Sequence, residues 1–376
     1  MEITGYISKN IGAVTVKLRS LRFILLSSFI FSHSVALLAQ TSTEQYFPGA
    51  TAEGAVYFLP KTAIRIAVQV EKTTYTPGDL APYAERYLRL SNVKQKAETT
   101  YRVLSIAQTA MGVRDTAKAY AIRFNNKTSA INVSQTADGV LLAINADAKE
   151  QAQPAVFTPA PKPAVTNPRQ FMTEEILAAG SMAKMAQLTA QEIYDLRDSR
   201  SQLIKGQADF MPKDGDQMKL MLGQLDRQDK ALTSLFAGTA VRDTTEEVFI
   251  VIPDKALEPT VVFRFSKHFG VVDADDMSGA PYYISVENLT ELPPTDTEAA
   301  QKKKKAANGL YYNVPGKMRA TLYRGNDVLS REEYPAGQFG NVELLSGDLF
   351  NKHYGTRLWL NPLSGNIERL EAEQPK

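Results

Sequence analysis

The chain has 376 residues, of which 44% are hydrophobic, with 43 basic residues, 41 acidic residues and no cysteine. The near balance of charge argues against nucleic-acid binding, and the missing cysteines exclude disulfide bonds, thiol catalysis and a lipid anchor on an N-terminal cysteine. The length and hydrophobic content favour two or three domains with buried cores.

Residues 1–39 have the order of a secretory signal peptide. Lys17, Arg19 and Arg22 precede an apolar run, and Ala39 offers a small residue for cleavage. The run is shorter than the roughly 20 residues that span a membrane, and a retained signal anchor is the alternative. The segment holds four of the 43 basic and one of the 41 acidic residues, so the remainder has 39 basic and 40 acidic residues. We expect an exported protein, periplasmic or associated with the outer surface, not a lipoprotein and without a transmembrane segment after cleavage.

The next two segments differ in composition. Segment 40–54 is small and polar, which predicts a flexible lead-in. Segment 55–152 is rich in β-branched residues, and Ile64, Ile66 and Val68 alternate with other residues as in a β-strand. It is predicted to form an N-terminal β-rich domain.

Segment 153–170 contains five prolines. Proline fixes φ and lacks an N–H donor, so this composition predicts an extended linker rather than helix or sheet interior. A ligand for a proline-recognising domain is the alternative.

Segment 171–238 has helical periodicity. Helices over 173–205 and 216–236, separated by Pro212 and Gly215, predict an antiparallel helical hairpin. The second helix carries an apolar stripe that is either a partner-binding face or a surface packed within the hairpin or on a sheet. The candidate partner-binding residues are Met218, Met221, Leu225, Leu232 and Phe236.

Segment 239–372 contains many short β-rich runs separated by turns, such as 324–327 and 362–366, which predict a β-sandwich-like domain. The whole chain is therefore predicted to be α+β. It would have two β-rich, sandwich-like domains and a helical hairpin after a proline-rich linker.

One pattern favours catalysis. Ser181 and Lys184 form S-x-x-K, in which the lysine lies one helical turn from the serine and can accept its proton. Tyr311 and His353 stand in stretches that resemble the second and third motifs of penicillin-binding proteins and serine esterases. The usual K-T-G is absent, and S-x-x-K arises easily by chance. A serine hydrolase acting on peptidoglycan or an ester is the alternative function.

The sequence patterns that would indicate a metal site, a cofactor or glycosylation are weaker. Asp273, Asp275 and Asp276 are close in sequence but do not fit the spacing of a calcium-binding EF-hand, so they indicate a metal site only weakly. No glycine-rich phosphate-binding motif occurs, and no cofactor is expected. Thr116 and Thr244 stand in Asp-Thr motifs that resemble the O-glycosylation acceptor of exported Bacteroidota proteins.

Several stretches together resemble an uncharacterised family of exported Bacteroidota proteins known only as a domain of unknown function. They are 57–62, 75–78, 83–88, 310–316, 338–340 and 359–365. The resemblance covers most of the chain after residue 39. It implies an envelope location but no activity and no site residues.

The preferred function is therefore that of a non-catalytic exported protein, a binding or structural component of the cell envelope. Its partner would be an unknown envelope protein or glycan and not a nucleic acid.

Overall fold

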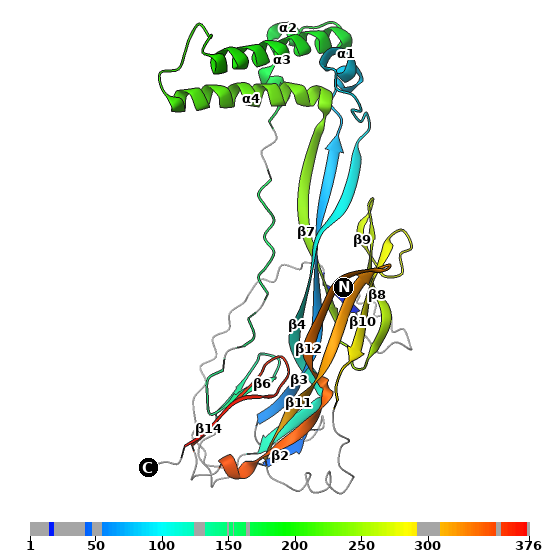
Figure 1. Ribbon diagram of the computed structural model, residues 1–376, viewed down its shortest axis with the longest axis vertical. Coiled ribbons are helices and arrows are strands. Elements are labelled where there is room, and N and C mark those ends of the chain that lie inside the picture. Colours follow the sequence, from blue (N-terminus) through cyan, green and yellow to red (C-terminus); the bar gives the residue numbers. More distant parts are fainter. Residues whose placement is uncertain are drawn as a thin grey trace.

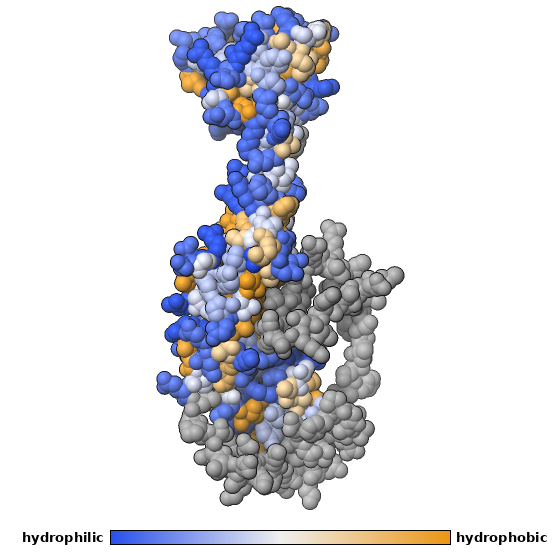
Figure 2. All heavy atoms as spheres, turned by 90° about the vertical axis from the view of Figure 1, so that its right-hand side faces the viewer, coloured by the Kyte–Doolittle hydropathy of each residue, from blue (hydrophilic) through white to orange (hydrophobic). Residues whose placement is uncertain are grey.

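The computed structural model describes residues 15–18, 42–46, 55–123, 132–148, 150–152, 154–162, 166–291, 309–350 and 355–373. They form a long molecule with a helical head at one end, a three-stranded stalk and a β-rich body (Figure 1). In the space-filling view the stalk is a narrow neck below the head (Figure 2).

The described elements follow one another as an α+β chain. The helices are η1 (Ala81–Tyr83), α1 (Ala84–Leu88), η2 (Pro168–Phe171), α2 (Glu174–Leu177), α3 (Met182–Lys205), α4 (Gly215–Ala237) and η3 (Gly347–Phe350). The strands are β1 (Thr15–Leu18), β2 (Ser42–Gln45), β3 (Ala55–Thr76), β4 (Glu98–Arg123), β5 (Val133–Gln135), β6 (Leu141–Ile144), β7 (Thr239–Val251), β8 (Leu257–Ser266), β9 (Gly270–Val272), β10 (Ala280–Asn288), β11 (Gly309–Arg324), β12 (Asp327–Ser346), β13 (Gly355–Leu360) and β14 (Ile367–Glu373).

β3 and β4 form the frame of the molecule. They pair antiparallel from Ala55↔Ile122 to Tyr75↔Glu98, a length of about 70 Å at roughly 3.3 Å per residue. β7 pairs with the other edge of β3, and the sheet order is β1-β7-β3-β4-β2. The upper parts of β3, β4 and β7 make the stalk (Figure 1).

A second antiparallel sheet, β12-β11-β10-β8-β9, packs on the middle of the first one. Alternate residues of β3, such as Ile64 and Ile66, are fully buried in the core between the two sheets. Aromatic rings stack within it: the ring centroids of Phe249 and Phe263 lie 4.9 Å apart, and those of Phe263 and Tyr282 lie 4.5 Å apart. This core holds β7, β8 and β10 together.

The third sheet, β14-β13-β6-β5, combines strands from distant parts of the chain. Its core includes Tyr57 of β3, Leu141 of β6 and Leu358 of β13, all fully buried. Strands of the predicted segments 55–152 and 239–372 therefore share two of the three sheets. The α+β class is confirmed, with three antiparallel sheets and a helical pair.

The described residues include only short parts of the predicted signal peptide and lead-in. β1 lies inside the predicted signal peptide and pairs with Val248–Val251 of β7. The rest of residues 1–39 lies outside the described residues, as does the predicted lead-in apart from 42–46. Among the described helices, none is long and apolar enough to cross a membrane.

The described parts of the proline-rich segment 153–170 run in extended form beside the stalk, from the body to the head (Figure 1). Lys162 Nζ forms an ion pair with Asp243 Oδ2 of β7 at 2.9 Å. The segment ends in η2 at the head, so it returns the chain along the stalk to the helices.

The head consists of the antiparallel pair α3 and α4, with the shorter helices at the stalk end (Figure 1). The helix predicted over 173–205 is interrupted at 178–181, and its two parts begin at separate caps, Thr173 for α2 and Ser181 for α3.

Candidate functional site

Side chains near their N-termini cap both long helices of the head. Ser181 Oγ accepts a hydrogen bond from the backbone N–H of Lys184 at 3.2 Å. Asp214 Oδ1 accepts one from the backbone N–H of Gln217 at 2.8 Å. Gly206 ends α3 with a φ of 69°, a left-handed conformation that favours glycine. Local sequence thus places the turn that reverses the chain.

Near the stalk, the apolar stripe of α4 is interior. Leu232 and Phe236 are fully buried in a cluster with Ile193 of α3 and with Leu80, the residue that precedes η1. The backbone N–H of Leu80 also donates to the carbonyl oxygen of Leu235 at 2.8 Å. Two of the five predicted partner-binding residues therefore hold the head together.

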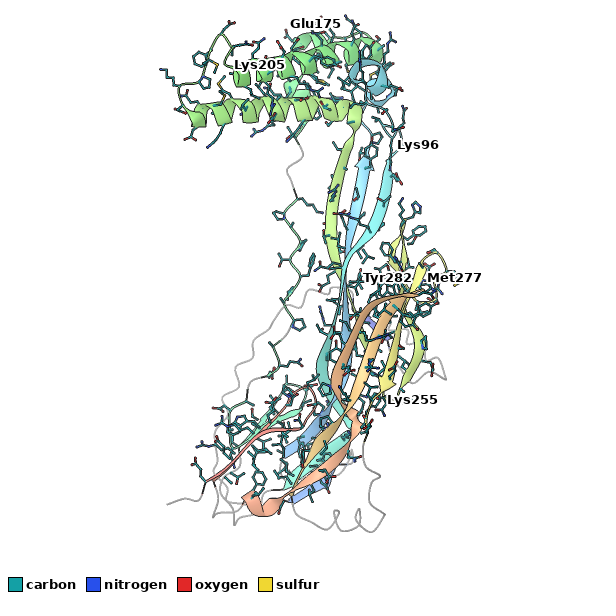
Figure 3. All side chains as sticks on the ribbon, in the orientation of Figure 1. Lys96, Glu175, Lys205, Lys255, Met277 and Tyr282 are labelled. Carbon is teal, nitrogen blue, oxygen red and sulfur yellow. The ribbon has the colours of Figure 1, made fainter. Side chains whose placement is uncertain are left out.

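Toward the free end of the hairpin, the same stripe opens into a groove of about 530 Å³ between α3 and α4, the tip groove. Phe210 and Leu220 in its wall are each 66% exposed. Figure 3 marks this end of the head with Lys205. The tip groove is lined by Ser199, Gln202, Leu203, Ala208, Phe210, Leu220, Met221, Gln224, Leu225 and Gln228.

The tip groove contains two of the predicted partner-binding residues, Met221 and Leu225, while Met218 lies partly buried on the preceding turn of α4. None of the lining residues is acidic or basic. The polar part of the lining is one serine and three glutamines, so the site is an apolar cleft edged by neutral hydrogen-bonding groups.

Ion pairs join the two helices outside the groove. Arg197 of α3 contacts Asp229 of α4 at 3.0 Å, and Arg200 of α3 contacts Asp226 of α4 at 2.8 Å. Neither pair lines the tip groove. The hairpin therefore has charged pairs that join its two helices on one side and an open groove with a neutral lining on the other.

The residues of the predicted hydrolase site do not meet. Ser181 and Lys184 lie at the start of α3 in the head, whereas Tyr311 lies on β11 in the body (Figure 1). His353 lies outside the described residues. The Ser181 hydroxyl serves as the helix cap by accepting from the backbone N–H of Lys184, a structural role in which the lysine side chain takes no part.

A buried polar cluster in the body was missed by the sequence reasoning. Lys118 Nζ of β4 donates to Asn313 Oδ1 at 3.2 Å and to the carbonyl oxygen of Gly337 at 2.7 Å. Asn313 Nδ2 donates in turn to the carbonyl oxygens of Pro60 and Ser364. The signal in the sequence is a lone lysine within the otherwise apolar alternating run 117–122.

Burial shifts the pKa values in this region. Desolvation lowers the pKa of Lys118, opposed by the charge of Asp115. Tyr120 stacks on Tyr311 with 4.5 Å between ring centroids, and burial is the main cause that raises the pKa of Tyr120 to about 12. Burial also raises the pKa of Tyr311. A raised pKa disfavours the phenolate that a tyrosine base would need at neutral pH.

The three candidate metal-binding aspartates lie in the loop between β9 and β10. Asp276 Oδ1 accepts a hydrogen bond from the backbone N–H of Ser278 at 2.9 Å, and hydrogen bonding to Ser278 lowers the pKa of Asp276. Within the described ranges, no three His, Cys, Asp or Glu side chains group as metal ligands would. Asp273 and Asp275 are part of the same loop.

The two candidate glycosylation residues differ in setting. Thr116 is exposed in a bulge of β4, where residues 115–118 lie opposite Leu59 alone. Asp115 Oδ1 accepts a hydrogen bond from the backbone N–H of Ala117 and so shapes this bulge. Thr244 is half-buried within β7 of the stalk, opposite Glu71.

A hollow of about 630 Å³ lies along β4 in the body, with Asp138 and Glu150 in its wall. Gln151 crosses it to β4: its Oε1 accepts from the backbone N–H of Gly112, and its Nε2 donates to the carbonyl oxygen of Ala110, both at 3.2 Å. Gln151 thus binds the backbone of β4 across this hollow, and we take the tip groove, which no such bond crosses in the described residues, as the candidate site.

Comparison with known proteins identifies a family but not an activity. A family model described as "Domain of unknown function (DUF4831)" matches residues 53–368, most of the chain. No curated protein and no solved structure matches the chain significantly.

Proposed function

Because the chain belongs to the DUF4831 family, whose function is unknown, we propose a function from its geometry: a non-catalytic component of the cell envelope that binds a helical surface of another protein molecule in the tip groove. The observation that carries this proposal is the change of environment along one stripe of α4. Leu232 and Phe236 are fully buried in the head core, whereas Met221 lines an open groove together with Leu225, which also packs against the edge of that core.

Packing physics favours a helix as the occupant. Near the stalk, helical segments of the same chain cover the α4 stripe. At the free end, Met221 and Leu225, four residues apart on α4, line the groove together with Leu203 of α3, and an apolar groove between two helices is the kind of surface that receives an amphipathic helix. Burying the exposed parts of Phe210 and Leu220 would each contribute about 1 kcal/mol or more at roughly 25 cal/mol per Å².

The stalk supports a binding role because it holds the tip groove far from the body (Figure 1). β3 and β4 each run as one continuous strand from the body through the stalk, so the head is carried by paired strands rather than by a flexible linker. A stalk of paired strands suits a binding surface that contacts another molecule at a distance from the body.

Export is part of the same proposal. It is supported by the order of basic, apolar and small residues within 1–39. Intact-mass analysis of the natively produced protein is expected to show a chain that begins at Gln40. A chain that keeps Met1 would remove export from the proposal.

Site-specific photocrosslinking tests docking in the cell. A photoreactive amino acid in place of Leu220 is expected to give a covalent adduct with a defined protein, because Leu220 lines the groove and is 66% exposed. The same amino acid in place of Val328, which is 54% exposed on β12 of the body, is the control and should not give that adduct. Identical adducts at both positions, or none at Leu220, would contradict the proposal.

A further inference from the structure

We infer that the molecule bound in the tip groove is a second copy of this chain, so that two hairpins associate about a two-fold axis as a four-helix bundle. This inference rests on the proposed docking function and names its partner. Two antiparallel hairpins are the components of an up-down four-helix bundle, and a two-fold dimer is the commonest closed assembly.

The lining of the tip groove is complementary to itself. In a two-fold interface the same patch faces its own copy, with residue i of one subunit against residue j of the other, so a patch that carries one kind of charge would oppose like charges. The tip groove has no charged residue, and its polar residues Gln202, Gln224 and Gln228 can each donate and accept hydrogen bonds. The neutral lining therefore favours self-association over a partner with a charged face, whose charges would be buried unpaired.

Charges at the margins of the groove select the orientation. Asp195 precedes Ser199 by four residues on α3, and Arg227 follows Gln224 by three on α4, so each lies beside the lining on its own helix. Both residues are exposed. Packing α3 on α4 of the other copy brings Asp195 near Arg227 of the partner subunit, whereas packing α3 on α3 would oppose like charges.

Asp195 and Arg227 also lie at similar positions along the hairpin axis, as this pairing requires. The ion pairs 197–229 and 200–226 show that position 199 of α3 lies level with Arg227 of α4. A two-fold axis parallel to the helices preserves that level, so Asp195 and Arg227 of the partner subunit are offset by four residues. At 1.5 Å per residue the offset is about 6 Å, within reach of an arginine side chain.

The size of the surface predicts a reversible dimer. The open half of each hairpin, from residue 199 to 206 on α3, is about 12 Å long and two helices wide. Such a face buries less than the roughly 1,600 Å² of a standard stable interface. We therefore expect a dimer that forms and dissociates in the micromolar range.

Sedimentation of the natively produced protein over a concentration series tests the inference. Leu220→Glu is expected to raise the dimer Kd by about tenfold or more, because it puts a charge into the self-facing apolar patch. Ile204→Glu is the matched control, since Ile204 is 58% exposed on the same hairpin but does not line the groove. Both positions are on the surface, so the fold tolerates either change.

Charge reversal tests the orientation. Arg227→Glu and Asp195→Lys are each expected to weaken the dimer, and the double variant to restore it. A protein that stays monomeric at all concentrations, or a dimer insensitive to Leu220→Glu, would overturn the inference. A monomer whose Leu220 adduct contains a different protein would overturn self-association alone, while the absence of any Leu220 adduct would count against docking itself.

Discussion

Lys118 stands on β4 between two alanines, yet its amine reaches Asn313 of β11 and Gly337 of β12. Burial lowers its pKa because a low-dielectric surrounding disfavours the charged form. The two hydrogen bonds offset part of that cost and join the first sheet to the second. The position of Lys118 therefore indicates a structural role.

Lys118→Met is expected to lower the free energy of unfolding by about 1–3 kcal/mol, because it removes the donor from the carbonyl of Gly337 and from the buried Asn313 side chain. Urea unfolding measures the change. Lys219→Met is the control, since the ion pair between Lys219 and Asp216 is exposed and contributes little. Equal losses in both variants would argue against a special role for Lys118.

Tyr120 determines part of the alkaline stability. Between pH 10 and about 12 the unfolded chain releases the phenolic proton while the folded chain keeps it. The unfolded state then binds fewer protons, so the free energy of unfolding falls as the pH rises through this window. The loss is roughly 1–2 kcal/mol after a discount for the partial exposure of the ring.

Tyr120→Phe is expected to reduce this alkaline loss, because phenylalanine has no proton to release. Urea unfolding of both proteins at several pH values between 10 and about 12 measures the difference. The lowered pKa of Lys118 has the opposite effect on the free energy of unfolding, because folded Lys118 releases its proton at a lower pH than unfolded Lys118 does. It is present in both proteins and cancels in the comparison. Identical pH slopes would show that Tyr120 does not contribute.

At the scale of elements, the first turn of α3 carries a sequence pattern that fits both a catalytic motif and a helix cap. Ser181 and Lys184 satisfy S-x-x-K, and they also satisfy the N-cap geometry in which a serine hydroxyl accepts from the backbone N–H three residues later. Tyr311 lies on β11 in the body, so the cap is the meaning that the observed contacts support.

Ser181→Ala is expected to lower the free energy of unfolding by about 1 kcal/mol. Ser181→Asp is expected to keep most of the original stability, because aspartate is also a favoured N-cap residue. Labelling with a fluorescent penicillin separates this structural role from catalysis. A covalent adduct on the natural protein that disappears in Ser181→Ala would revive the hydrolase hypothesis.

The helical pair illustrates what periodicity can predict. The spacing of Met221, Leu225, Leu232 and Phe236 correctly predicted a helix with one apolar face. It did not predict that the stalk half of that face is covered and the free half open, because the covering residues, such as Leu80, lie about 150 positions away in the chain. The spacing of the apolar residues thus indicated the helix face that contains the candidate site, but not which part of that face is open.

At the scale of the whole molecule, the stalk is the unexpected feature. The sequence predicted a β-rich domain for segment 55–152 but not the length of its strands, and β3 and β4 extend over 22 and 26 residues. The body half of β3 packs in the core, but its residues 72–76 are exposed or only half-buried. The same strand therefore changes from a two-layered to a single-layered environment.

Amide hydrogen exchange is expected to be slower for β3 residues 63–70 than for residues 72–76. Both parts pair with β4 and β7, so hydrogen bonding alone predicts equal protection. Local opening of the stalk exposes less apolar surface and so costs less free energy. Equal protection along the strand would show that the stalk opens only with the whole molecule.

The composition and local patterns of this chain determined its α+β class, the helical pair and the apolar stripe. These features depend on residues within a few positions of each other, which a sequence displays directly. The sharing of sheets between early and late strands, the cluster around Lys118 and the extent of the tip groove depend on contacts between distant residues. The bond between the Tyr57 hydroxyl and the carbonyl oxygen of Tyr311 joins positions 254 residues apart. Such contacts follow from the packing of the whole chain, because local propensity constrains each strand but not the partner with which it pairs.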